Sequence, residues 1–122
     1  MDGGWSLDES VALAKLLHSE GVDLVDCSSS GNVSHAVVPT TPGYQVFIAE
    51  AVRQKAGIMT AAVGLISDPR QADEIISSGQ ADLVLLGREL LRNPTFPIQA
   101  AQQLGFPPPI PPQYLRAYRS SN

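Results

Sequence analysis

One stretch decides the fold of this chain: ADLVLLGRELLRNP, residues 81–94. Its apolar run, residues 83–86, is short and bounded by turn residues, which is typical of a strand buried on both faces. Gly87 lets the backbone approach a ligand closely, Arg88 follows at the carboxyl end of the strand, and residues 89–91 make a short helical turn. Backbone donors, a helix N-terminus and a guanidinium that converge on one point form a phosphate site, as at the last strand of a (β/α)8 barrel. A solvated arginine in a common Gly-Arg dipeptide is the alternative interpretation.

The composition indicates one globular domain without nucleic-acid or membrane character. The chain has 122 residues, 43% of them hydrophobic and only 16% charged, and the low charge suggests that part of the surface is covered. A net charge of −4 without a basic cluster argues against nucleic-acid binding. No apolar run reaches the roughly 18 residues of a membrane span, and the N-terminus lacks a signal-peptide pattern. We therefore expect a soluble, cytoplasmic protein that binds neither nucleic acid nor a membrane.

The single cysteine, Cys27, excludes an internal disulfide and a zinc site built from thiolates, so no metal site is expected. No base at a suitable spacing argues for a nucleophile, and Cys27 is interpreted as a small core residue.

Amphipathic helices alternate with buried strands along the chain. A capping box, Ser6 to Glu9, opens the first helix, which ends at Gly21 and carries a surface histidine, His18, in its last turn. On the second helix the inward-facing residues are expected to be Phe47, Ile48, Ala51 and Val52, and on the third Ala72, Ile75 and Ile76. The further elements expected are a strand at 22–27, a helix at 44–56, a strand at 58–65, a helix from Asp68-Pro69 to Gly79, and a helix from Asn93-Pro94 to Leu104.

Polar and glycine residues follow the strands at their carboxyl ends. Ser28 begins a long polar segment, residues 28–43, whose hydroxyls and N–H groups either meet a ligand or make local turn contacts. Gly64 likewise is either a turn residue or a point of close backbone approach to a ligand.

The C-terminal region, residues 106–122, is interpreted as a proline-rich arm that follows the α/β part at residues 1–105. Residues 106–112, FPPPIPP, predict an extended polyproline II segment, and two tyrosines then bracket Arg116. This region is either a solvated tail or an arm that docks on a neighbouring subunit.

The order α-β-α-β-α-β-α predicts the α/β class with parallel strands joined by helices. Three such strands leave two hydrophobic edges open, so the unit fits a slice of a (β/α)8 barrel or of a doubly wound sheet. Neither GxGxxG nor GxxxxGK[ST] is present, so the usual nucleotide motifs are absent.

Several motifs, in order, resemble the Old Yellow Enzyme family, most of all its compact bacterial class of FMN-dependent NADPH oxidoreductases. The resemblance covers roughly Gly3 to Tyr118 and corresponds to the C-terminal third of the family, a partial (β/α)8 TIM barrel with the last three βα units, strands six to eight. The motifs that carry it are DLVDCSS at 23–29, PGYQV at 42–46, AVGLI at 62–66, ADLVLLGRELLRNP at 81–94 and PQY at 112–114.

The resemblance implies FMN at the mouth of the barrel. By it, Gly64, Gly87 and Arg88 hold the FMN phosphate, Ser28 lies near the cofactor, and Arg116 reaches a neighbouring subunit's active site. The family passes hydride from NAD(P)H through FMN to enone-type acceptors. Ser30 and Ala117 stand where the family usually has glycine, which puts the loop after strand six and the arm in question. The family's catalytic residues belong to the part outside this chain, so no catalytic residue is assigned here.

Two functions remain open at this point. The first is the phosphate-binding part of an FMN-dependent NAD(P)H oxidoreductase, completed by a homo-oligomer or by a complementing chain. The second is a non-catalytic, self-associating barrel fragment without bound cofactor. An independent doubly wound domain is disfavoured by the missing nucleotide motifs.

Overall fold

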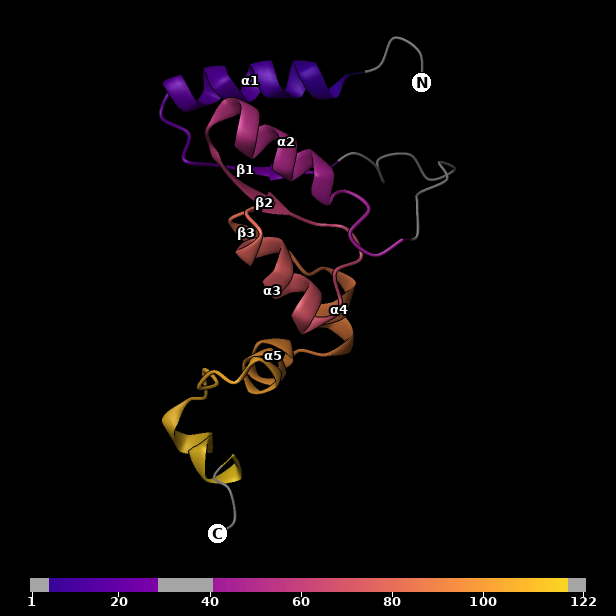
Figure 1. Cartoon of the computed structure of the whole chain (residues 1–122). Coiled ribbons are helices and arrows are strands. Elements are labelled where there is room, and N and C mark those ends of the chain that lie inside the picture. Colours follow the sequence, from indigo (N-terminus) through magenta and orange to yellow (C-terminus); the bar gives the residue numbers. More distant parts are fainter. Residues whose placement is uncertain (1–4, 29–40, 119–122) are drawn as a thin grey trace.

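The computed structural model describes residues 5–28 and 41–118 (Figure 1). Residues 29–40, which include Ser30 and most of the polar segment after the first strand, lie outside the described residues. The elements in chain order are α1 (Leu7–Ser19), β1 (Leu24–Cys27), α2 (Val46–Ala56), β2 (Met59–Ala62), α3 (Pro69–Ser77), β3 (Leu83–Val84), α4 (Arg88–Arg92), α5 (Phe96–Leu104) and a 3₁₀ helix, η1 (Pro112–Ala117).

The three strands form one parallel sheet in the order β1-β2-β3. Leu24 lies opposite Met59 and Cys27 opposite Ala62, while Ala61 lies opposite Leu83. The α/β class with parallel strands is therefore confirmed. The assignment of these units to barrel strands six to eight stays a prediction.

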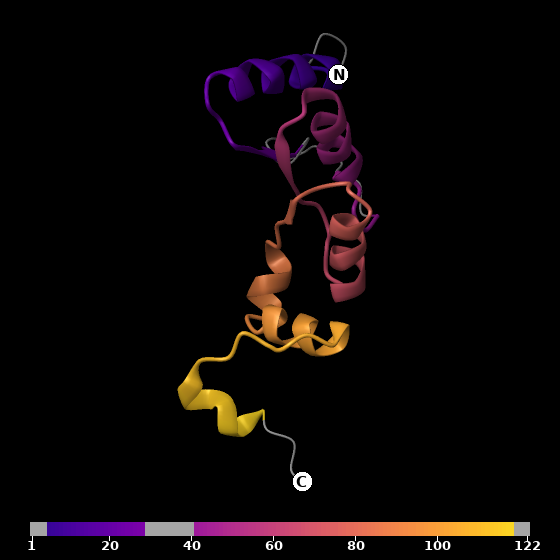
Figure 2. The same cartoon turned by 60° about the vertical axis from the view of Figure 1, so that its left-hand side comes forward.

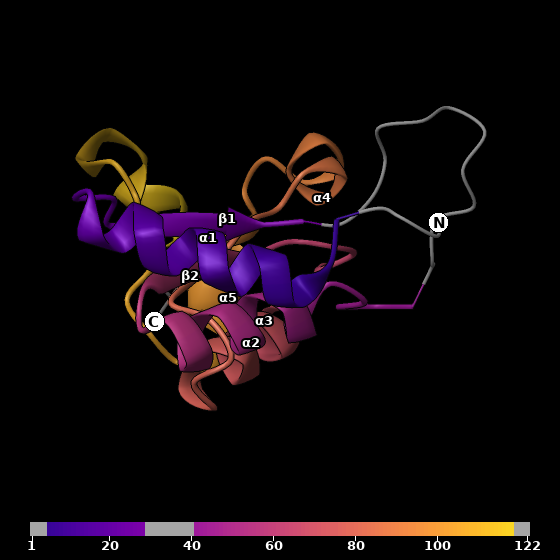
Figure 3. The same ribbon diagram turned by 90° about the horizontal axis from the view of Figure 1, so that it is seen from above.

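Helices α1, α2 and α3 cover one face of this sheet, as the view from above shows (Figure 3). The inner residues of these helices pack with the strands in one hydrophobic core. Four of its residues are each at most 2% exposed: Ala49, Val52, Ile58 and Ala62. The elements follow one another from α1 at one end to η1 at the other (Figure 2). Among the described residues, no helix combines the length and the apolar character needed to cross a bilayer.

The starts of α1 and α3 follow the local signals in the sequence. The Ser6 N–H donates to the Glu9 carboxylate at 2.7 Å and the Glu9 N–H to the Ser6 hydroxyl at 3.2 Å, so the capping box is confirmed. Asp68 caps α3 by accepting from the Arg70 N–H at 2.9 Å, with Pro69 as the first helical residue. His18 is exposed, as predicted.

Two predicted inner residues are wrong. Phe47 is 59% exposed and Ile76 is 40% exposed, and the buried positions of α2 are Val46, Ala49 and Val52. The Thr60 hydroxyl donates to the Ala49 carbonyl at 3.2 Å, so α2 approaches β2 closely. Such an approach requires a small residue at the contact, and the larger Phe47 consequently turns outward.

Some element bounds are shorter than predicted. Only Leu83–Val84 of the run 83–86 pairs in the sheet, and Leu83 is 52% exposed. Among the described residues, β3 pairs with β2 alone. Helix α5 starts at Phe96 because the Asn93-Pro94 step forms a turn, in which the Phe96 N–H donates to the Asn93 carbonyl at 3.1 Å.

The proline run is not extended throughout. The Ile110 N–H donates to the Pro108 carbonyl at 2.9 Å, which is a three-residue turn, and η1 then begins at Pro112. Five of the seven residues at 106–112 are prolines and lack an N–H, and the Phe106 N–H donates to the Ala101 carbonyl, so the turn forms at the remaining donor of the run, Ile110.

One carboxylate joins three elements at the amino ends of the strands. Asp82 accepts from the Thr60 N–H at 3.0 Å and from the Arg53 Nε at 3.1 Å, and Arg53 also donates to the Gly79 carbonyl at 3.1 Å. The Thr60 N–H and, to a smaller extent, Arg53 lower the pKa of Asp82, although partial burial opposes them. The ionised carboxylate therefore ties α2, β2 and the start of β3 together.

We expect Asp82→Asn to lower the free energy of unfolding by about 1–2 kcal/mol at pH 7, since charge-assisted hydrogen bonds become neutral ones. Because the folded pKa is lowered, this stabilisation is present above the unfolded pKa of Asp82 and is lost as the pH falls through the folded value. Urea denaturation from pH 7 down to pH 3 should show a shallower acid loss in the variant than in the wild type. Asp73→Asn, at an exposed position of α3, is the control, and equal acid loss in both variants would contradict the expectation.

Candidate functional site

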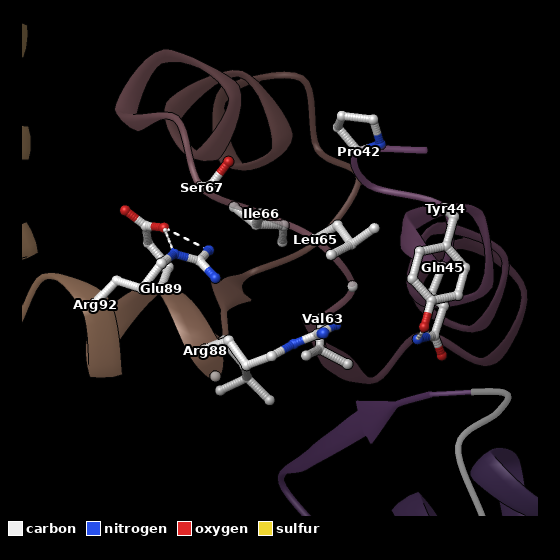
Figure 4. Close-up of a pocket in the computed structure, with 13 residues that line it drawn as sticks. Pro42, Tyr44, Gln45, Val63, Leu65, Ile66, Ser67, Arg88, Glu89 and Arg92 are labelled. Atoms are coloured by element: carbon white, nitrogen blue, oxygen red, sulfur yellow. Dashed lines mark hydrogen bonds and ion pairs between the residues drawn. The ribbon is translucent and has the colours of Figure 1, made fainter. Parts of the chain in front are cut away.

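A pocket of about 330 Å³ lies at the carboxyl ends of β2 and β3 (Figure 4). It is bounded by the segment before α2, by the turn that follows β2, and by the start of α4. The lining residues are Pro42, Tyr44, Gln45, Val63, Gly64, Leu65, Ile66, Ser67, Leu85, Gly87, Arg88, Glu89 and Arg92. Parallel strands place ligand sites at this edge of a sheet, so the position agrees with the sequence prediction.

The turn after β2 has an unusual backbone. Gly64 has φ +125° and Leu65 has φ +51°, the one positive φ of a residue other than glycine in the described part of the chain. A non-glycine residue held there costs on the order of 1–3 kcal/mol, and such outliers cluster at ligand sites. The Gly64 carbonyl accepts from the Gly43 N–H at 2.9 Å, which ties this turn to the segment before α2.

Tyr44 and Gln45 form the wall of the pocket against Gly64. Gln45 is 4% exposed, and its amide nitrogen donates to the Tyr44 hydroxyl at 2.5 Å. A Cβ built on Gly64 would lie 3.1 Å from the Tyr44 ring and 3.3 Å from the Gln45 Cβ. The backbone of the turn therefore packs directly against this wall, and only glycine leaves room for it.

Arg88 supplies the free cation of the pocket. It is exposed, its side chain extends toward Val63 in the close-up, and it has no hydrogen bond or ion pair with any described residue (Figure 4). Arg92, by contrast, is neutralised by Glu89, with two contacts of 2.8 and 3.2 Å to the same carboxylate oxygen. One unpaired guanidinium thus borders the pocket.

The residue before α4 leaves space for a ligand. Gly87 has no atom within 4 Å of the place where a Cβ would be, and it has no side chain that could cap the helix. Across 5–28 and 41–118, the Gly87 and Arg88 N–H groups donate to no carbonyl. The open backbone, the donors and Arg88 lie together, and their chemistry suits an anion.

Of the site residues predicted from the sequence, the structure brings three together. Gly64, Gly87 and Arg88 all line the pocket. Ser28 is exposed and lines a separate cavity of about 130 Å³ between α1, α2 and β1. Arg116 is exposed in η1 and does not line the pocket. The roles of all five residues stay predictions.

Five polar residues of the pocket were not assigned to a site from the sequence: Tyr44, Gln45, Ser67, Glu89 and Arg92. Tyr44 and Gln45 belong to the PGYQV motif. This motif contributed to the family resemblance, but it gave no indication that its side chains lie at the pocket. Arg92 lies four residues after Arg88, one helical turn further on, and that spacing was the available signal.

The remaining titratable candidates suggest no second centre. Burial raises the pKa of the Cys27 thiol, and the nearby Asp26 carboxylate raises it further, which suits an inert core residue. Among residues 5–28 and 41–118, no three His, Cys, Asp or Glu side chains gather closely enough to hold a metal ion.

Comparison with known proteins gives consistent results. The profile of the NADH:flavin oxidoreductase / NADH oxidase family matches residues 1–106. The chain is 50% identical over 117 residues to an NADPH dehydrogenase of Halalkalibacterium halodurans and 46% identical over 117 residues to one of Bacillus subtilis. Each alignment covers 96% of this chain and 34% of the relative, so the chain spans about a third of the length of these relatives. An NADPH dehydrogenase of Geobacillus thermodenitrificans is 50% identical over 116 residues, with 95% of this chain and 34% of the relative covered.

A pair of alanine substitutions tests the geometry of the pocket. We expect Gly64→Ala to lower the free energy of unfolding by about 2–3 kcal/mol, because a Cβ at φ +125° is strained and would press on Tyr44 and Gln45. Gly87→Ala should stay within about 1 kcal/mol of the wild type, since its Cβ enters open space at a negative φ. Urea denaturation monitored by circular dichroism measures both, and equal losses would show that the wall does not constrain the turn.

Proposed function

Because the chain belongs to the NADH:flavin oxidoreductase / NADH oxidase family, we propose that its pocket binds the phosphate of FMN. The family membership confirms the resemblance to Old Yellow Enzyme that the motifs of the sequence indicate. The observation that carries the proposal is the unpaired Arg88 guanidinium beside Gly64 and Gly87 at the strand ends.

The residues present fit a phosphate. Arg88 offers a planar pair of donors that matches phosphate oxygens, and no carboxylate of the described residues competes for it. The open backbone at Gly87 lets N–H donors approach an anion without interference from a side chain. A pocket of about 330 Å³ has room for a phosphate and the chain that carries it. Glu89 also lines this pocket, and its carboxylate is paired with Arg92.

The proposed activity is that of an FMN-dependent NAD(P)H oxidoreductase that reduces activated C=C bonds of enone-type acceptors. When bound, FMN would supply hydride transfer between NAD(P)H and such an acceptor. The residues of this chain would hold and orient the phosphate: Arg88 by an ion pair, and Gly87 through its backbone donor. The relatives named NADPH dehydrogenase support the choice of reductant, and their threefold greater length supports catalytic residues outside this chain.

Ser28 and Arg116 have proposed roles away from the pocket. Ser28 follows β1 at the same edge of the sheet, where it would approach another part of the cofactor. Arg116, exposed and without a partner in the described part of the chain, would act at a neighbouring subunit. Both proposals depend on the family resemblance.

We expect Arg88→Ala to weaken FMN binding at least about tenfold, since one charge-assisted contact to the phosphate is lost. Binding of riboflavin, which lacks the phosphate, should be weak and equal in the wild type and the variant. Quenching of flavin fluorescence during titration measures both affinities. Arg70→Ala, at an exposed position of α3 outside the pocket, is the matched control.

Two results would contradict the proposal. Equal FMN affinity for the wild type and Arg88→Ala would show that the FMN phosphate does not bind at Arg88 in this pocket. A wild type that binds riboflavin as tightly as FMN would show that no phosphate site contributes.

A further inference from the structure

An ion pair on α4 borders the same pocket as Arg88. The Arg92 guanidinium donates to one Glu89 carboxylate oxygen, from Nη2 at 2.8 Å and from Nε at 3.2 Å. Glu89 and Arg92 both line the pocket. Figure 4 shows the pair at one side of the pocket, whereas the Arg88 side chain extends toward Val63. Two cations and one anion therefore share the wall that α4 supplies.

The two partners of this pair differ in exposure. The Glu89 side chain is 17% exposed and the Arg92 side chain is 62% exposed. Water screens a covered charge less than an exposed one, so the Glu89 carboxylate acts on its surroundings more strongly than a charge at the surface does. A carboxylate at the wall of an anion site repels the anion unless a cation neutralises it. Among the described residues, Arg92 is the one cation that pairs with Glu89.

Helix geometry gives each charge on α4 a defined neighbour. Glu89 and Arg92 are three residues apart, so they meet on one face of the helix, whereas the adjacent residues Arg88 and Glu89 do not face each other. Arg88 and Arg92 are four residues apart, and like charges at this spacing repel. Pairing with Glu89 offsets that repulsion and engages two N–H groups of Arg92. Arg88 consequently stays free for a ligand.

The charged residues that line the pocket are Arg88, Glu89 and Arg92, and their charges sum to +1. Loss of Arg92 alone would leave the carboxylate unmatched and would bring the sum to zero. Loss of the Glu89 charge alone would raise the sum to +2, and loss of both would return it to +1. Because Coulomb attraction follows these charges, the affinity of the pocket for an anion should rise and fall in the same order.

We propose that Arg92 is a positioning residue of the anion site: it binds no phosphate oxygen itself but neutralises the Glu89 carboxylate, so that Arg88 meets a phosphate monoester without a competing negative charge. The contacts carry this assignment, since two N–H groups of Arg92 donate to Glu89 and its side chain lies mostly in solvent. The inference rests on the proposed function for its ligand, the phosphate of FMN. It adds that the pair on α4, and not Arg88 alone, sets the affinity for that phosphate.

Titrations with FMN at low salt, followed by flavin fluorescence, test this charge order. Arg92→Ala should weaken FMN binding about tenfold, Glu89→Gln should strengthen it about threefold, and the double variant should bind within about twofold of the wild type. In about 1 M salt, where the screening length is about 3 Å, the differences should shrink to about twofold or less. Riboflavin, which lacks the phosphate, should bind equally to all four proteins.

The same changes on α3 provide matched controls. Arg70→Ala and Glu74→Gln lie at exposed positions outside the pocket and should bind FMN like the wild type. Circular dichroism of each variant checks its fold, and an ion pair between neighbouring helix residues contributes little to stability.

Other roles of Arg92 predict different results. If the pair were merely structural, Glu89→Gln would weaken FMN binding as Arg92→Ala does, because both changes break the pair. If Arg92 bound the phosphate itself, the double variant would stay as weak as Arg92→Ala. Either result overturns the inference, and so does equal FMN affinity for Arg92→Ala and the wild type.

The failure of this inference is distinguishable from the failure of the proposed function. Weaker FMN binding by Arg88→Ala with unchanged binding by Arg92→Ala keeps the proposed function and overturns the inference. Where the wild type binds no flavin, inorganic phosphate is titrated instead while the amide NMR signals of Gly87 and Arg88 are followed. The expected order of phosphate affinities then supports the inference and contradicts the proposed function, whereas signals that do not respond to phosphate overturn both.

Discussion

The close approach of α2 to β2 determines most of this structure. Thr60 and Ala49 have no exposed surface, and the Thr60 hydroxyl donates to the Ala49 carbonyl across their contact. β2 is the central strand, so this contact fixes the helix layer relative to the whole sheet. It also fixes the pocket, because the segment before α2 carries Tyr44 and Gln45 while β2 leads into Gly64. Two walls of the site are thus continuations of α2 and β2, which this contact holds together.

The two ends of the sheet serve different purposes. At the amino ends, Asp82, Arg53 and Thr60 satisfy one another, and their backbone is regular. At the carboxyl ends, Leu65 has a left-handed backbone and Arg88 has no partner among the described residues. Strain and an unpaired charge are tolerated where a ligand relieves them, whereas a satisfied network contributes stability alone. This division is the one found in (β/α)8 barrels, whose carboxyl-end face carries the active site.

Local signals in the sequence predicted the starts of α1 and α3 and the order of elements, because capping boxes and proline at the first helical turn act within a few residues. The same kind of signal at Asn93-Pro94 was wrong for α5, which starts at Phe96. Gly64, Gly87 and Arg88 were also predicted to meet, since parallel strands bring their carboxyl ends to one edge. The outward turn of Phe47 was not predictable, because it depends on how closely α2 approaches the sheet. The exposure of Leu83 depends on what packs against its face of the sheet, and Tyr44 reaches the pocket through a tertiary contact with Gly64. Periodicity carries no information about such contacts.

The charge balance of the pocket sets how strongly it can attract an anion. Pairing of Glu89 with Arg92 leaves Arg88 as the net charge at the start of α4, which suits a single phosphate rather than a polyphosphate. Two opposite unit charges 4 Å apart attract by about 1 kcal/mol in bulk water but by about 4 kcal/mol at an effective dielectric constant of 20. Arg88 is exposed in this chain, so its attraction for a phosphate lies near the lower value. Exclusion of water from the same guanidinium would move its attraction for a phosphate toward the higher value.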